Sequence, residues 1–151
     1  MTMRTRVSNV AIAVALALAV CRSAIAAETA KVVVTPRADL KWTESGIPGV
    51  SAAVVEGDMG KGPSRFYLKY AAGFVAPIHH HSPDHYVTTL VGNLVLVVDG
   101  KEHRLPAGSY FAFTGKAKHA ARCEGSEACV MFIDARGAWD VVPDSKPDAK
   151  Q

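Results

Sequence analysis

Ten short runs of strand-forming residues, separated by turn signals, most limit what this chain can fold into. The runs are rich in Val, Tyr, Phe and Thr, and turn residues such as Gly92-Asn93 and Asp99-Gly100 separate them. No stretch keeps a helical apolar period for three turns. The pattern predicts an all-β sandwich or barrel. The runs are KVVVTP, LKWTE, VSAAVVEG, RFYLKYAAG, HYVTTLVG, LVLVVDG, KEHRL, SYFAFTG, KHAARC and ACVMFIDA.

The N-terminus has the three parts of a secretory signal peptide. A basic MTMRTR start precedes an apolar stretch from Val10 to Val20, and Ala24-Ile25-Ala26 forms a cleavage box. The apolar stretch is about half of the roughly 20 residues that a membrane helix needs. Lipoprotein processing at Cys21 is an alternative, but the preceding valine fits it poorly. We therefore predict a periplasmic or secreted protein that has no membrane anchor after cleavage.

Cleavage after residue 26 sets the domain organisation and the charge of the mature protein. We predict a signal peptide at 1–26, one domain at 27–143, and a polar tail that frays at 144–151. Cleavage removes three of the 17 basic residues and no acidic one, which leaves 14 basic and 14 acidic residues. A neutral protein lacks the basic footprint of a nucleic-acid binder, so we expect no nucleic-acid partner. The basic residues removed are Arg4, Arg6 and Arg22.

Two cysteines, Cys123 and Cys129, remain after cleavage. The polar segment EGSEA between them is of the kind that closes a hairpin, which would bring the two sulfurs together across neighbouring strands. An oxidising compartment favours a disulfide, and a pair of buried free thiols is the alternative.

Four histidines have the spacing of a metal site in a β-barrel. Side chains alternate between the two faces of a strand, so His79, His81 and His85 can share an inward face while His80 points away. His119 follows in a later strand-like run. Buried imidazoles would lose their hydration without gaining a compensating interaction unless they bound a partner, so the shared face predicts metal ligation.

These residues resemble the cupins, whose fold is a double-stranded β-helix, or jelly-roll barrel. The first cupin motif has the form G-x5-H-x-H-x3-E-x6-G and the second G-x5-P-x-G-x2-H-x3-N. The resemblance covers roughly residues 40 to 140, and its flanks are similar to a subgroup of small cupins without assigned function. In the first motif Gly73, His79, His81 and Gly92 match and His85 replaces Glu; in the second Gly108 and His119 match, while Thr114, Lys116 and Cys123 replace Pro, Gly and Asn.

The resemblance implies one divalent transition metal held by His79, His81 and His119, with His85 in the fourth position. Imidazole ligands suit Fe, Cu, Ni and Zn, and the loss of the carboxylate disfavours harder ions such as Mn. The alternative for His85 is a base that supports the site or faces the substrate without binding the metal.

The other polar candidates have structural interpretations. We expect His80 and His103 to be surface residues or core residues with satisfied hydrogen bonds, and Asp84 and Tyr86 to form a solvated rim. Thr89 is in phase with His85, so we expect its hydroxyl in the cavity.

The aromatic candidates are also interpreted structurally. Phe66 and Tyr70 share an alternating face with Leu68 that would line the core. Trp42 and Trp139 are expected to pack against edges rather than to bind sugars.

Two functions are consistent with this sequence. The first is a metal-dependent enzyme of oxygenase, isomerase or lyase type that acts on a small oxygenated substrate. The second is a non-catalytic module whose saturated metal site stabilises the barrel or senses a metal or small ligand. An open coordination position distinguishes the two, because a structural site is closed.

We also expect a homodimer. A two-sheet sandwich has exposed edges, and an N-terminal strand from a second copy can cover one of them. The Val-rich run KVVVTP is the segment predicted to do so.

Overall fold

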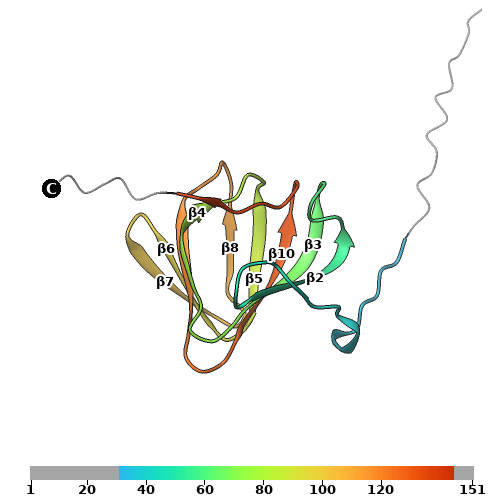
Figure 1. The fold of residues 1–151 in the computed structure, drawn as a ribbon, viewed down its shortest axis with the longest axis horizontal. Coiled ribbons are helices and arrows are strands. Elements are labelled where there is room, and N and C mark those ends of the chain that lie inside the picture. The colour runs from blue at the N-terminus through green and yellow to red at the C-terminus, as the bar shows by residue number, and fades with distance from the viewer. Residues whose placement is uncertain (1–30, 145–151) are drawn as a thin grey trace, which may run out of the picture. The chain divides into compact units, whose positions relative to one another are not determined.

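The computed structural model describes residues 31–144, which form two antiparallel sheets (Figure 1). One sheet has the strand order β1-β2-β3-β10-β5-β8, and the other has the order β11-β4-β9-β6-β7. Residues 37–39 form a short 3-10 turn, η1 (Arg37–Asp39). The strands are β1 (Thr43–Glu44), β2 (Val50–Gly57), β3 (Ser64–Tyr70), β4 (Val75–His80), β5 (His85–Val91), β6 (Asn93–Val98), β7 (Lys101–Pro106), β8 (Tyr110–Phe113), β9 (His119–Glu124), β10 (Cys129–Ala135) and β11 (Val142–Pro143).

This architecture confirms the predicted all-β fold and its jelly-roll arrangement. The described part of the chain contains no helix long and apolar enough to cross a bilayer. The predicted signal peptide at 1–26 lies outside the described residues, as does nearly all of the predicted tail at 144–151.

The core lies between the inner faces of the two sheets. Along β10 every second residue is buried, and its neighbours are half-buried. On β3 the predicted inward face is confirmed, because Phe66, Leu68 and Tyr70 are all buried and belong to the core cluster. Burial of one such large apolar side chain is worth about 1.5–3 kcal/mol. The strict alternation of β3 and β10 therefore fixes which face of this sheet meets the other sheet.

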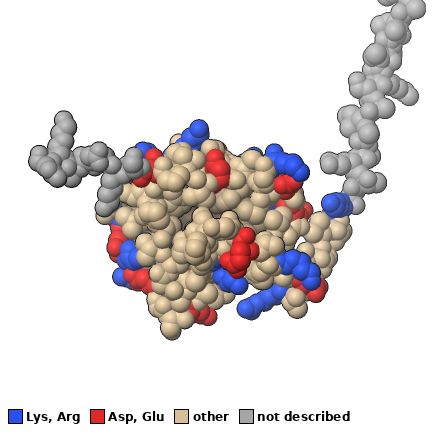
Figure 2. Space-filling view, viewed as in Figure 1, with Lys and Arg blue, Asp and Glu red and all other residues tan. Residues whose placement is uncertain are grey.

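Charged side chains on the exterior form ion pairs. Arg122 on β9 binds Glu102 on β7 at 2.9 Å, reaching across β6, and Arg104 pairs with Glu124. Val95 of β6 lies in register between the two arginines and is only 1% exposed although it belongs to the outward row. Figure 2 shows both signs of charge interspersed around the face in view, with uncharged surface between them.

Nine of the ten predicted strand runs contain a strand, and KVVVTP does not. The structure assigns no strand to residues 31–36, and Val34 is 78% exposed. A strand needs a hydrogen-bonded neighbour, and among the described residues this run has none, so high β-propensity alone leaves it irregular. The prediction that KVVVTP is a strand is therefore wrong for the single chain. The homodimer stays a prediction.

The predicted disulfide between Cys123 and Cys129 is present, with the two Cα atoms 5.7 Å apart. The predicted hairpin around it is wrong. β9 pairs with β4 and β6, whereas β10 pairs with β3 and β5, so the EGSEA segment crosses from one sheet to the other. The disulfide therefore fastens the two sheets together at this crossing. Cys123 is buried on the same side of β9 as His119, as predicted.

Removal of this crosslink should lower stability without abolishing the fold. The disulfide closes a short loop, so chain entropy predicts a loss of about 2 kcal/mol in the free energy of unfolding for a Cys123→Ala, Cys129→Ala double variant. Urea denaturation under non-reducing conditions measures the loss. With dithiothreitol present, the parent should fall to the stability of the variant. Equal urea midpoints without reductant, or two freely alkylated thiols in the unreduced parent, would contradict this prediction.

Candidate metal centre

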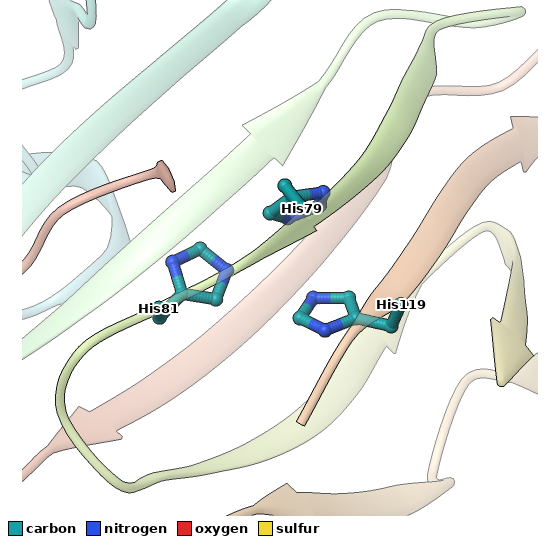
Figure 3. A group of neighbouring side chains, drawn as sticks. All are labelled: His79, His81 and His119. Carbon is teal, nitrogen blue, oxygen red and sulfur yellow. The ribbon is translucent and has the colours of Figure 1, made fainter. Parts of the chain in front are cut away.

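Three histidines from neighbouring strands meet at one end of the interior (Figure 3). His79 belongs to β4, His81 follows the end of β4, and His119 is the first residue of β9. β4 and β9 pair with His79 opposite His119, which places these two rings side by side with centroids 4.3 Å apart. One ring nitrogen of each histidine lies within 4.8 Å of the others. All three residues are buried, with exposed fractions of 5 to 6%.

His85 reaches the same place by a different route from the predicted one. β4 ends at His80, and the chain turns through residues 81–84 into β5 of the other sheet. Strand alternation therefore explains His79 and His81, whereas His85 enters from the opposite wall. Its ring centroid lies 4.7 Å from that of His81 and 6.3 Å from that of His119. His85 is thus beside the three-histidine group but outside its 4.8 Å limit, and ligation by His85 stays a prediction.

Each of these four imidazoles is oriented by a backbone carbonyl. A carbonyl only accepts hydrogen bonds, so the bonded Nδ1 carries the proton and Nε2 retains its lone pair. This is the form in which histidine binds a metal, with the second nitrogen fixing the ring. The Nδ1 contacts are His79 to Pro77 O at 2.7 Å, His81 to Asp140 O at 2.5 Å, His85 to Pro83 O at 3.1 Å, and His119 to Ala117 O at 3.0 Å.

Burial also keeps these imidazoles neutral. Desolvation lowers the pKa of His81 to about 3 and that of His119 to about 4, although the carbonyl hydrogen bonds oppose the shift. The pKa values of His79 and His85 are lowered for the same reason. At neutral pH the cluster therefore presents uncharged donors, as metal ligation requires.

Two aromatic rings enclose the cluster. Trp139 stacks on His81 with centroids 4.0 Å apart and an interplanar angle of 24°, and Phe113 stacks on His119 at 4.0 Å and 10°. The interpretation of Trp139 as an edge residue is wrong, because its indole lines the interior. Trp139 lies outside the predicted strands, so no alternation pattern identified its direction. Trp42, in contrast, lies under Lys69 away from the cluster, at 4.4 Å from Nζ to the ring centroid.

The polar neighbours confirm most of their predicted roles. His103 is exposed, and His80 points away from the cluster and binds Asp144 at 2.7 Å. Asp84 accepts a hydrogen bond from the backbone of Gly115 at the rim. Thr89 differs from expectation: it is fully buried but does not line the cavity.

A small cavity extends from the histidines into the core. Its volume is about 30 Å³, and a water molecule needs about 10–15 Å³ on this measure, so the cavity holds about two or three waters. Its lining residues are apolar apart from three histidines, Tyr70 and Trp139. The lining residues are Leu68, Tyr70, His81, His85, Val87, Leu94, Leu96, Phe111, His119, Ala121, Met131, Ile133 and Trp139.

The donor set fits a transition metal. Three converging neutral imidazoles with fixed tautomers match the ligands preferred by Fe, Cu, Ni and Zn. None of the four histidines brings a negative charge, so an ion held here would retain its full charge toward an exogenous ligand. Apolar walls around such a site would keep bulk water away from it.

Comparison with known proteins agrees with this fold. A family model described as a cupin domain matches residues 66–134. Among solved structures, KdgF from Halomonas sp. has a TM-score of 0.57 at 19% identity, covering 67% of this chain and 92% of that chain. The polyketide cyclase RemF from Streptomyces resistomycificus has a TM-score of 0.64 at 16% identity, covering 78% and 89%.

A sugar phosphate isomerase from Silicibacter pomeroyi has a TM-score of 0.54 at 19% identity, covering 66% of this chain and 72% of that chain. Comparison with curated proteins finds no match. At these identities the structural likeness establishes the fold and leaves the reaction open.

In the metal-free protein, the interior histidines should resist protonation. Nitrogen-15 NMR should show the Nδ1–H tautomer for all four at neutral pH, with His81 and His119 remaining neutral down to about pH 4. In 8 M urea the same side chains should titrate near their ordinary pKa of about 6.5. Between those two pH values the unfolded chain binds more protons than the folded chain. The free energy of unfolding should therefore fall as the pH falls through that window. Protonation of His81 near pH 6.5 in the folded protein would refute the assignment.

Proposed function

The chain belongs to the cupin superfamily, and from that premise we propose that it is an exported protein that binds one divalent transition metal inside its barrel. His79, His81 and His119 are the proposed ligands, and His85 is the proposed fourth. The observation that carries this proposal is the set of four Nδ1–carbonyl hydrogen bonds, each of which leaves Nε2 free to ligate. Fe, Cu, Ni and Zn are the candidate metals.

The proposed activity is metal-dependent chemistry of oxygenase, isomerase or lyase type on a small oxygenated substrate. The metal, when bound, supplies Lewis acidity toward an oxygen atom. The chain's own residues hold the ligand rings, exclude bulk water with apolar walls, and limit the size of what enters. His85 is the one imidazole with a second possible role, since it lies outside the 4.8 Å group and next to the cavity. As a neutral imidazole it could accept a proton there.

The comparisons are consistent with several reactions. The solved structures similar to this chain include a protein named as a polyketide cyclase and another named as a sugar phosphate isomerase. Both names describe chemistry on oxygenated substrates, which supports that substrate class here as a proposal. The small cavity argues against a whole sugar lying beside the histidines while the interior keeps the form described above.

A non-catalytic metal or ligand sensor is the second candidate. The size of the same cavity favours it, because room for about two or three waters leaves little space for a substrate beside the histidines. An open coordination position decides between the two candidates. Saturation by all four histidines would leave little exchangeable water on the ion and would favour the sensor.

Metal content is the direct test of the site. Protein purified from the periplasm should contain about one metal ion per chain, as measured by elemental analysis, and a His79→Ala, His119→Ala double variant should lose it. His103→Ala is the matched control because His103 is exposed and lies on β7, the edge strand of its sheet. Metal content in the double variant equal to that of the parent would show that the assignment is wrong.

His85→Ala separates ligation from a supporting role. Loss of one of four ligands should change the coordination geometry reported by the visible spectrum of the Co(II)-loaded protein, whereas loss of a side chain that only supports the site should weaken the metal affinity and leave that spectrum unchanged. Metal competition assays measure the affinity, and an oxygen-consumption screen of the loaded protein tests the enzyme candidate.

Export rests on the sequence of residues 1–26 and is supported by the disulfide, which is typical of an oxidising compartment. Cell fractionation followed by N-terminal sequencing should place the protein in the periplasm or the medium, beginning at Ala27. An uncleaved chain in the cytoplasmic fraction would contradict export.

A further inference from the structure

Trp139 occupies a fixed place between β10 and β11. Its backbone N–H donates to the carbonyl of Met59 at 2.7 Å. The next residue, Asp140, forms hydrogen bonds with His81 and Ser82. Its carbonyl accepts the Nδ1 proton of His81, and its carboxylate accepts hydrogen bonds from the N–H and the hydroxyl of Ser82 at 2.7 and 2.6 Å. The segment that carries the indole is therefore tied to the ligand it covers.

The indole covers two of the four imidazoles. It stacks on His81, meets His85 edge-on with centroids 5.1 Å apart at 86°, and packs edge-on against Phe66 at 5.1 Å. Phe66 has no exposed surface, so this contact anchors the inner edge of the indole in the core. His119 is covered separately by Phe113.

Trp139 also forms part of the boundary between the cavity and the solvent. Its side chain lines the cavity, yet the residue is only half-buried, whereas His81 and His85 are 6% and 3% exposed. The indole therefore lies on the lining of the cavity, against two rings that are themselves almost fully buried. With the indole in place, the cavity that it lines has room for about two or three heavy atoms.

We propose that Trp139 is a gate residue that shields His81 and His85 and restricts the site to ligands of about two or three heavy atoms. The ligand class follows from size and charge together. Four neutral donors leave the charge of a bound cation uncompensated, so a small anion or a polarisable diatomic molecule is favoured over a ring. The shielding stands on the geometry alone, and the ligand class rests on the proposed metal function.

Chemical modification of the metal-free protein tests the shielding. Diethyl pyrocarbonate acylates neutral imidazole nitrogens, and peptide mass spectrometry resolves the rate at each histidine. In Trp139→Ala, His81 and His85 should react about tenfold faster than in the parent, because their cover is removed. His119 should change less, because Phe113 still covers it. His103, exposed in both proteins, should react at the same rate.

Three variants make the modification result decisive. Trp139→Phe should give intermediate rates, and Trp42→Ala, which removes the other tryptophan, should match the parent. Unchanged rates at His81 and His85 in Trp139→Ala would overturn the gate. An equal rise at all four interior histidines would also overturn it, because it would mean that Trp139 supports the whole fold instead of covering two rings.

Ligand binding to the cobalt-loaded protein tests the size limit. Azide and benzoate have the same charge and differ in size, and the visible spectrum of Co(II) reports binding of either. The parent should bind azide and discriminate against benzoate by at least about tenfold, and Trp139→Ala should lose most of that discrimination through tighter benzoate binding. Equal affinities in the parent, or an unchanged ratio in the variant, would overturn the size limit. If neither protein binds cobalt, the metal function fails, while the modification experiment still decides the shielding.

Discussion

The structure depends on a constraint that four imidazoles impose on an otherwise apolar interior. A buried polar group without a partner costs about 1–3 kcal/mol, and four histidines with exposed fractions of 3 to 6% lie at one end of the core. Each meets the constraint by donating Nδ1–H to a backbone carbonyl. Three of these carbonyls lie two residues before their histidine, so the local chain supplies them: Pro77 for His79, Pro83 for His85 and Ala117 for His119. The fourth, from Asp140, comes from the far end of the chain. Docking of the segment before β11 is therefore part of how His81 is held.

The sequence identified the residues of this site more successfully than the strand pairings that bring them together. Alternation along β4 correctly placed His79 inward and His80 outward, because that rule depends on local backbone geometry alone, and His81, directly after the strand, is buried as predicted. It gave a wrong reason for His85, since alternation does not reveal that the chain changes sheets at residues 81–84. The disulfide was predicted correctly for the same cysteines, but its supposed hairpin was a crossing between sheets. In both cases the pairing partners of a strand lie far away in the sequence, where local pattern carries no information.

The direction of the Trp139 side chain could not be predicted from the sequence. It follows β10 in an irregular segment, where neither strand nor helix periodicity assigns a side-chain direction. Its position is set by long-range contacts: Met59 holds its backbone, and Phe66 and His81 hold its ring. KVVVTP is the converse case, because its β-propensity is high and its neighbours supply no strand to pair with among the described residues. A segment of high β-propensity forms a strand only where another strand is available to pair with it. A polar or aromatic side chain joins a site only where long-range contacts position it there.

Charge and packing together narrow the chemistry of the interior. Four neutral donors would leave a divalent ion uncompensated in apolar surroundings, where electrostatic interactions are strong. The acidic side chains nearest the cluster are bound elsewhere: Asp84 accepts from the Gly115 backbone, Asp144 binds His80 and Lys118, and Asp140 binds Ser82. Compensation must then come from a bound anion or from solvent-derived ligands small enough for a cavity of about 30 Å³. The replacement of the cupin carboxylate by His85 would therefore increase the attraction of the site for an anion. The indole of Trp139 on the cavity lining would limit the size of that anion.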